Sequence, residues 1–301
     1  MLRLYLLRVQ DFSLVGELSK TSDFGGSEYG GGNNCILELA WSVPMWIQAA
    51  DLISDWSGWT TSDKDAFQRW LANEAFRRTA YSSRVRKNNW GAGGSAASAI
   101  IADYVYGSKY NLVEVKPNAK TLTPAQAYRE HMQMQKDRMN TSWKGDSQCS
   151  IWGIRPHGGY PDELRRGSTG CNGTYLKSSD AALTYMSTIG ETFILSAEVA
   201  LRGGDASLYQ NRNSDGSGSL LQLIRFVIDN PTKSYDWTTH KKSPLYAAYR
   251  YYKHSSIKNR LDNNNPYFKS SEAWPFGKLT HSFASSEINS LPNLPVVEPP
   301  K

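Results

Sequence analysis

Cysteine is scarce in this sequence, with three residues in a chain of 301. This scarcity excludes a fold that depends on a framework of disulfide bonds. One bridge between Cys149 and Cys171 is compatible with the sequence, and so are three reduced thiols. No C-x-x-C or H-E-x-x-H pattern and no spaced group of histidines and cysteines occurs in the sequence, so we expect no structural zinc site.

Long apolar runs and a strong charge of one sign are also missing. No stretch of about 18 consecutive apolar residues occurs, which excludes a membrane-spanning helix. The opening MLRLYLLRVQ has two arginines within its apolar stretch and no small-residue cleavage site, so it predicts no signal peptide. The net charge of +6 is a mild bias toward anionic partners such as nucleic acid, anionic lipid or acidic polysaccharide.

Strand patterns are nearly absent, whereas apolar residues recur at helical spacing along most of the chain. Ser62 with Asp65 is a capping signal for one of these helices, and Thr123 followed by Pro124 for another. The pattern predicts helices over about 35–56, 62–76, 94–106, 123–139, 179–201, 219–230 and 243–254.

Successive helices joined by turns, without coiled-coil heptads, predict an all-α fold of helical hairpins packed around a centre. We expect one domain over residues 1–285, followed by a proline-rich tail over residues 286–301. Residues 140–180 are rich in Gly, Ser and Pro and are too long for a simple connector, which is typical of a functional or disordered loop.

Three segments carry side chains suited to chemistry. The first is RVRKNNWG, residues 84–91, in which two amides and an indole follow a basic stretch. The second is RPHGGYPDELRR, residues 155–166, and the third is ALTY, residues 182–185, at the start of a predicted helix. Each segment alone is a weak signal, because Asn-Asn is common in turns and arginines are mostly exposed to solvent.

Taken in order, the three segments resemble the alginate lyase superfamily of polysaccharide lyases. That family has an Asn-Asn-His motif before a helix, a segment similar to DGxLPxELxR, and a helix that begins ALxYH and ends near an Ala-Glu pair. Residues 157–166 fall on the second segment, residues 182–185 on the start of that helix, and Ala197 and Glu198 on the later pair. The resemblance covers roughly residues 34–260 and implies an (α/α) toroid that cleaves uronate polymers by β-elimination.

The chemistry of β-elimination explains why these residue types are needed. The C5 proton of a uronate is weakly acidic while its carboxylate is charged, because the enolate would carry two negative charges. An amide and a guanidinium at the carboxylate spread that charge, and a tyrosine can protonate the departing O4. The resemblance implies that Asn89 and Arg166 neutralise the carboxylate and that Tyr185 is the acid, with no metal or organic cofactor required.

The family's histidine after Asn-Asn is Trp90 here, which leaves the base open. His157 lies inside the matched segment and is one candidate. His131 is a second candidate, although its polar neighbours in the predicted helix 123–139 favour a solvated surface position. Tyr185 could also act as both base and acid in a syn elimination, where the proton and the leaving group lie on the same face of the sugar, as in polymannuronate.

Other residues of these segments are candidates for substrate binding. Sugar rings stack on aromatic faces, and arginines add positive potential to a cleft, whereas core packing and a solvated patch are the corresponding structural alternatives. These candidates are Trp90, Asn88, Tyr160, Arg165 and Arg86.

The resemblance therefore implies a lyase on an anionic polysaccharide, with mannuronate-rich alginate first and polyglucuronate second. The alternatives are a glycoside hydrolase on a helical toroid and a non-catalytic toroid that binds acidic glycans. Asp162 and Glu163 are adjacent and point in different directions, which makes them a poor acid–base pair for hydrolysis. We expect no nucleic acid or membrane partner and a monomer, and such a substrate favours a secreted or periplasmic location.

Overall fold

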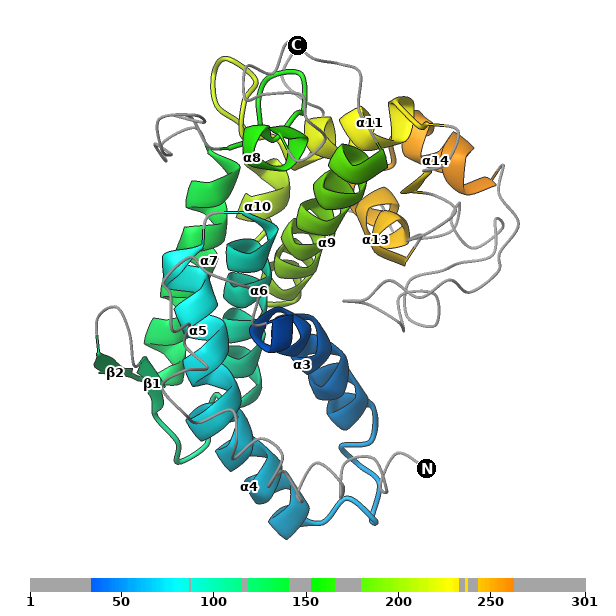
Figure 1. Ribbon diagram of the computed structural model, residues 1–301. Coiled ribbons are helices and arrows are strands. Elements are labelled where there is room, and N and C mark those ends of the chain that lie inside the picture. Colours follow the sequence, from blue (N-terminus) through cyan, green and yellow to red (C-terminus); the bar gives the residue numbers. More distant parts are fainter. Residues whose placement is uncertain are drawn as a thin grey trace. The chain divides into compact units, whose positions relative to one another are not determined.

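In the computed structural model, the described part of the chain is mostly helical and contains one antiparallel pair of short strands (Figure 1). The predicted all-α class is confirmed. None of the described helices is long and apolar enough to cross a membrane. The structure describes residues 34–86, 88–114, 119–140, 153–165, 180–232, 236–237 and 243–262.

The chain divides into two compact units. Unit 1 comprises Met1–Arg86 and Gly93–His131, and unit 2 comprises Lys87–Ala92 and Met132–Lys301. The single domain expected over residues 1–285 stays a prediction, and the tail 286–301 lies outside the described residues.

The first helix of unit 1 ends before the predicted residue 56, whereas the helical run predicted over 62–76 continues to Val85. The helix α3 (Asn34–Leu52) is followed by α4 (Thr61–Trp70), a π-helical turn η3 (Leu71–Ala75) and α5 (Phe76–Val85). The predicted cap by Ser62 and Asp65 is wrong. Thr60 Oγ1 instead accepts a hydrogen bond from Asp63 N, and Asp63 Oδ2 accepts one from Thr60 N, both at 3.2 Å. Both pairs have the capping-box spacing, so spacing alone does not choose between them.

Two further helices have residues in both units, α6 (Asn89–Tyr104) and α7 (Pro124–Met139). The α7 bounds confirm the predicted helix. In contrast, α6 begins at Asn89 and not at Gly94, where the prediction has it begin. Glycine has a weak helix propensity, so the sequence suggests a helix that starts at Gly94 rather than one that contains it. Gly94 instead allows close packing on α5, since a Cβ atom there would lie 2.6 Å from Thr79 O.

The strands β1 (Leu112–Glu114) and β2 (Lys120–Leu122) are too short for a sequence period to reveal them. Glu114 at the end of β1 is buried and bonds Arg84 Nη2 through Oε1 at 2.7 Å. His131 Nε2 lies 3.3 Å from the same oxygen, and its Nδ1 lies 2.9 Å from Ser83 Oγ. The expected surface position of His131 is therefore wrong, because the buried Glu114 carboxylate holds the ring inside unit 1.

This cluster predicts a loss of stability in acid. Burial alone would raise the pKa of Glu114, but the interactions with His131 and Arg84 outweigh it and lower the pKa from 4.5 to about 2. Because the folded state holds the charged form, the resulting stability is present above the unfolded pKa and is lost between about pH 5 and pH 2. We expect a loss of about 3 kcal/mol in the free energy of unfolding over that range.

Urea unfolding at several pH values checks this expectation. The variant Glu114→Gln should be less stable than the unmodified chain at pH 7 and should lose correspondingly less stability in acid. Identical pH dependence in the two proteins would contradict the assigned role of Glu114.

Unit 2 is built around α9 (Asp180–Arg202), which is buried from Met186 through Glu198 (Figure 1). Gly190 permits the close approach of a neighbouring helix, because a Cβ atom there would lie 2.8 Å from Leu223 Cδ2. Four helices pack against α9. These helices are α8 (Pro161–Leu164), α10 (Ser207–Gln210), α11 (Leu220–Asp229) and α13 (Ser243–Tyr252), and α14 (Ser255–Asp262) contacts α11 and α13.

Candidate functional site

The start of α6 positions the two predicted asparagines. The first backbone N–H groups of a helix have no partner within the helix, so other groups must accept from them. Asn88 is the N-cap, and its Oδ1 accepts a hydrogen bond from Trp90 N at 3.2 Å. Asn89 N donates to Glu163 Oε1 at 2.5 Å. Asn88 thus has a capping role that accounts for its presence without substrate contact.

Glu163 links the segment 155–166 to the segment 84–91, both of which resemble the lyase family. It lies on α8, the short helix that opens with Pro161 directly after Tyr160, and it is buried. A carboxylate at the N-terminus of α6 also interacts favourably with the helix dipole. Because 74 residues separate Asn89 from Glu163, this bond brings distant parts of unit 2 together.

The side chain of Asn89 is 1% exposed. Its Oδ1 has no hydrogen-bond partner among the residues that the structure describes. Buried polar atoms in native proteins are nearly always hydrogen-bonded, so an unsatisfied one requires an explanation such as a ligand. Within the described residues, the fold therefore provides no hydrogen-bond partner for this buried acceptor oxygen.

Tyr160, the residue directly before α8, contacts α9. Tyr160 N donates to Met186 Sδ at 3.3 Å, and the Tyr160 ring packs against Phe193 with centroids 6.2 Å apart. The Tyr160 ring is fully buried, and burial raises its pKa. The expected role of Tyr160 in lining a sugar-binding groove is therefore replaced by core packing. Tyr185 directly precedes Met186 on α9 and is half-buried.

The two adjacent carboxylates of α8 are both engaged. Asp162 accepts a hydrogen bond from Arg165 Nε at 2.6 Å, and Glu163 accepts from Asn89 N. Arg165 thus pairs with Asp162 rather than standing alone as a cation for substrate. This arrangement does not provide the two facing carboxyl groups that glycoside hydrolysis needs.

His157 is exposed in the turn before α8. Partial burial, together with the charge of Arg155, lowers its pKa, which favours the neutral imidazole. However, its Nδ1 accepts a hydrogen bond from Gly159 N at 3.2 Å, so the neutral ring carries its proton on Nε2. His157 must break this bond before Nδ1 can remove a proton from a substrate.

Two further predicted residues, Trp90 and Arg86, are only partly exposed. Trp90 is half-buried in the first turn of α6. Arg86 is half-buried at the end of α5 in unit 1, where its backbone N donates to Ser82 O at 3.0 Å. Arg166, Cys149 and Cys171 lie outside the described residues.

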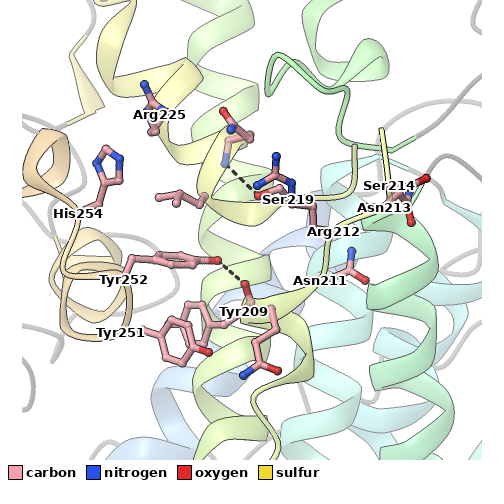
Figure 2. Close-up of a pocket in the computed structure, with 13 residues that line it drawn as sticks. Tyr209, Asn211, Arg212, Asn213, Ser214, Ser219, Arg225, Tyr251, Tyr252 and His254 are labelled. Carbon is pink, nitrogen blue, oxygen red and sulfur yellow. Dashed lines mark hydrogen bonds between the residues drawn. The ribbon is translucent and has the colours of Figure 1, made fainter. Parts of the chain in front are cut away.

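Unit 2 also contains a pocket of about 700 Å³ that sequence analysis missed (Figure 2). It lies among α10, the loop that follows it, α11 and the end of α13, and none of the predicted site residues lines it. No single motif reveals it, because its residues come from separate segments that read as ordinary turns and amphipathic helices. The loop NRNSDGSGS carries only turn signals.

Among the residues that the structure describes, no group of three or more His, Cys, Asp and Glu side chains could hold a metal ion. The hydrogen bonds from Asn89 N to Glu163 Oε1 and from Tyr160 N to Met186 Sδ connect α6, α8 and α9. Compared with known proteins, the chain matches no protein-family model, no curated protein and no solved structure.

Proposed function

We propose that the chain is a polysaccharide lyase that cleaves a uronate polymer by β-elimination, with polymannuronate first and polyglucuronate second. The observation that best supports this proposal is the hydrogen bond of 2.5 Å from Asn89 N to Glu163 Oε1. It joins two of the segments that resemble the lyase family, as a shared reaction site requires. The arrangement of the helical hairpins as an (α/α) toroid belongs to the same proposal.

In the proposed reaction, the Asn89 amide and the Arg166 guanidinium bind the uronate carboxylate and stabilise the enolate. The C5–H bond breaks, a double bond forms between C4 and C5, and the bond from C4 to O4 breaks as O4 takes up a proton. Tyr185 is the proposed donor of that proton.

The bonding of the two described candidate histidines favours Tyr185 as the base as well. His131 is held by Glu114 within unit 1, and the Nδ1 lone pair of His157 is engaged by Gly159 N. A single tyrosine can serve both steps only when the proton and the leaving oxygen lie on one face of the sugar. Polymannuronate meets this requirement, and so does polyglucuronate, which has the same configuration at C4 and C5.

A non-catalytic protein that binds acidic glycans is the second candidate. Two observations favour it: Trp90 replaces the histidine of the family, and the Asn89 side chain is buried. The two candidates differ in whether polymer is converted to product.

A screen across purified uronans tests the proposal. Incubation with polymannuronate should give rising ultraviolet absorbance from the double bond conjugated to the carboxylate, with a weaker signal from polyglucuronate. New reducing ends without this chromophore would indicate hydrolysis and contradict the proposal. Binding of the polymers without any product would favour the second candidate.

A further inference from the structure

The pocket in unit 2 has a volume of about 700 Å³, within the range of about 300–1,000 Å³ that is typical of sites for small organic ligands (Figure 2). Of its 13 lining residues, none is Asp or Glu. The lining consists of three cationic or imidazole side chains, three tyrosines, four amides, two serine hydroxyls and Leu221. Such a lining favours a ligand that carries both a negative charge and several hydroxyl groups.

The charge of the pocket comes from Arg212 and Arg225. Within the described ranges Arg212 has no carboxylate partner, and the Nε of Arg225 is 3.7 Å from Asp229 Oδ2, a long contact at the surface. Guanidinium groups that are not tightly paired in the fold remain available to bind a carboxylate through two parallel hydrogen bonds.

His254 adds a hydrogen-bond donor to the same part of the pocket. Its Nδ1 accepts from Ser256 N at 3.2 Å, so the neutral ring carries its proton on Nε2. Burial and the charge of Arg225 lower the pKa of His254, which favours this neutral form. In Figure 2 these nitrogen-bearing side chains lie above the tyrosine rings.

The three tyrosines form an aromatic cluster. The rings of Tyr209 and Tyr251 are stacked with centroids 4.2 Å apart, and Tyr252 packs edge-on against Tyr209 at 5.3 Å. Tyr252 Oη donates to Tyr209 O at 2.8 Å, and Tyr209 Oη donates to Glu198 at 2.6 Å, which fixes two of the rings. The negative faces of aromatic rings attract the C–H groups of a pyranose.

We propose that this pocket binds a uronate residue of an acidic polysaccharide, at a place separate from Asn89, Glu163 and Tyr185, none of which lines it. Arg212 and Arg225 would bind the carboxylate, the half-buried rings of Tyr251 and Tyr252 would pack against the sugar ring, and nearby amides such as Asn213 and Gln222 would bind hydroxyls. The choice of ligand rests on the proposed function, whereas binding itself does not require catalysis.

Calorimetric titration with a saturated mannuronate tetrasaccharide tests this proposal. The Tyr185→Phe variant serves as the background, so that the ligand is not consumed. In that background Arg212→Ala and Arg225→Ala should each weaken binding by about 10- to 100-fold, the effect of losing a hydrogen bond to a charged group. The control Arg202→Ala removes an exposed arginine outside the pocket and should leave binding unchanged.

The uncharged analogue mannotetraose should not compete for the site. Absence of tetrasaccharide binding, or equal binding by both pocket variants and the control, would overturn the proposal. Competition by sulfate at the same concentration as the tetrasaccharide would also overturn it, because it would indicate an unspecific anion site.

A chromophore that forms without any effect of the pocket variants on binding would refute this pocket alone. Pocket-dependent binding without a chromophore would instead refute the lyase activity alone.

Discussion

Replacing Tyr185 by phenylalanine is expected to lower the rate of uronate elimination by about 10²- to 10⁴-fold, the usual contribution of general acid–base catalysis. The substitution removes only the phenolic oxygen and keeps the ring. Tyr185 is half-buried on α9, and the next residue, Met186, accepts a hydrogen bond from Tyr160 N. The helix around residue 185 should therefore keep its place. Initial rates of ultraviolet absorbance on polymannuronate measure the effect.

Tyr106→Phe is the matched control, because that ring is 71% exposed in unit 1 and should not affect the rate. If Tyr185 serves as both base and acid, His157→Ala should retain most of the activity. A Tyr185→Phe protein as active as the Tyr106→Phe control would refute the assigned role.

The second large effect is expected at Asn89. Asn89→Ala removes the amide that is proposed to neutralise the carboxylate, and loss of one such group typically costs about 10²- to 10³-fold in rate. Its Oδ1 has no hydrogen-bond partner within the described part of the chain, so the substitution breaks no described bond of that oxygen. The backbone N–H to Glu163 is retained. Thermal unfolding and initial rates together measure the outcome.

For Asn88, which is next to Asn89, we expect the reverse: the substitution mainly lowers stability and has less effect on the rate. Asn88→Ala removes the N-cap of α6 and should cost about 1 kcal/mol of stability, with a smaller effect on rate than Asn89→Ala. Equal losses of rate in the two variants would contradict the separate roles of capping and chemistry.

The helices of this protein are well predicted where one apolar face repeats over many turns. The bounds of α7 and α9 agree closely with the sequence prediction, since α9 has a continuous apolar face and α7 has a Thr-Pro start signal. The start of α6 is missed because Gly93 and Gly94 resemble a loop, whereas Gly94 is required for close packing against α5. This shift places Asn89 and Trp90 inside the helix.

The candidate site is predicted less completely, because its contacts join distant segments. The motif order identifies Asn89 and the PDEL segment, but the hydrogen bond from Asn89 to Glu163 is a tertiary contact that no local pattern encodes. In the same way, polar neighbours in sequence suggest an exposed His131, whereas the ring faces the buried Glu114 of a strand too short to predict.

The mass of the products released from polymannuronate tests the central claim most directly. Elimination predicts fragments in which the new non-reducing end is unsaturated and lighter by one water than a hydrolysis product of the same length. Their formation should disappear with Tyr185→Phe. Fully hydrated fragments, or polymer that remains intact although the folded protein binds it, would contradict the account.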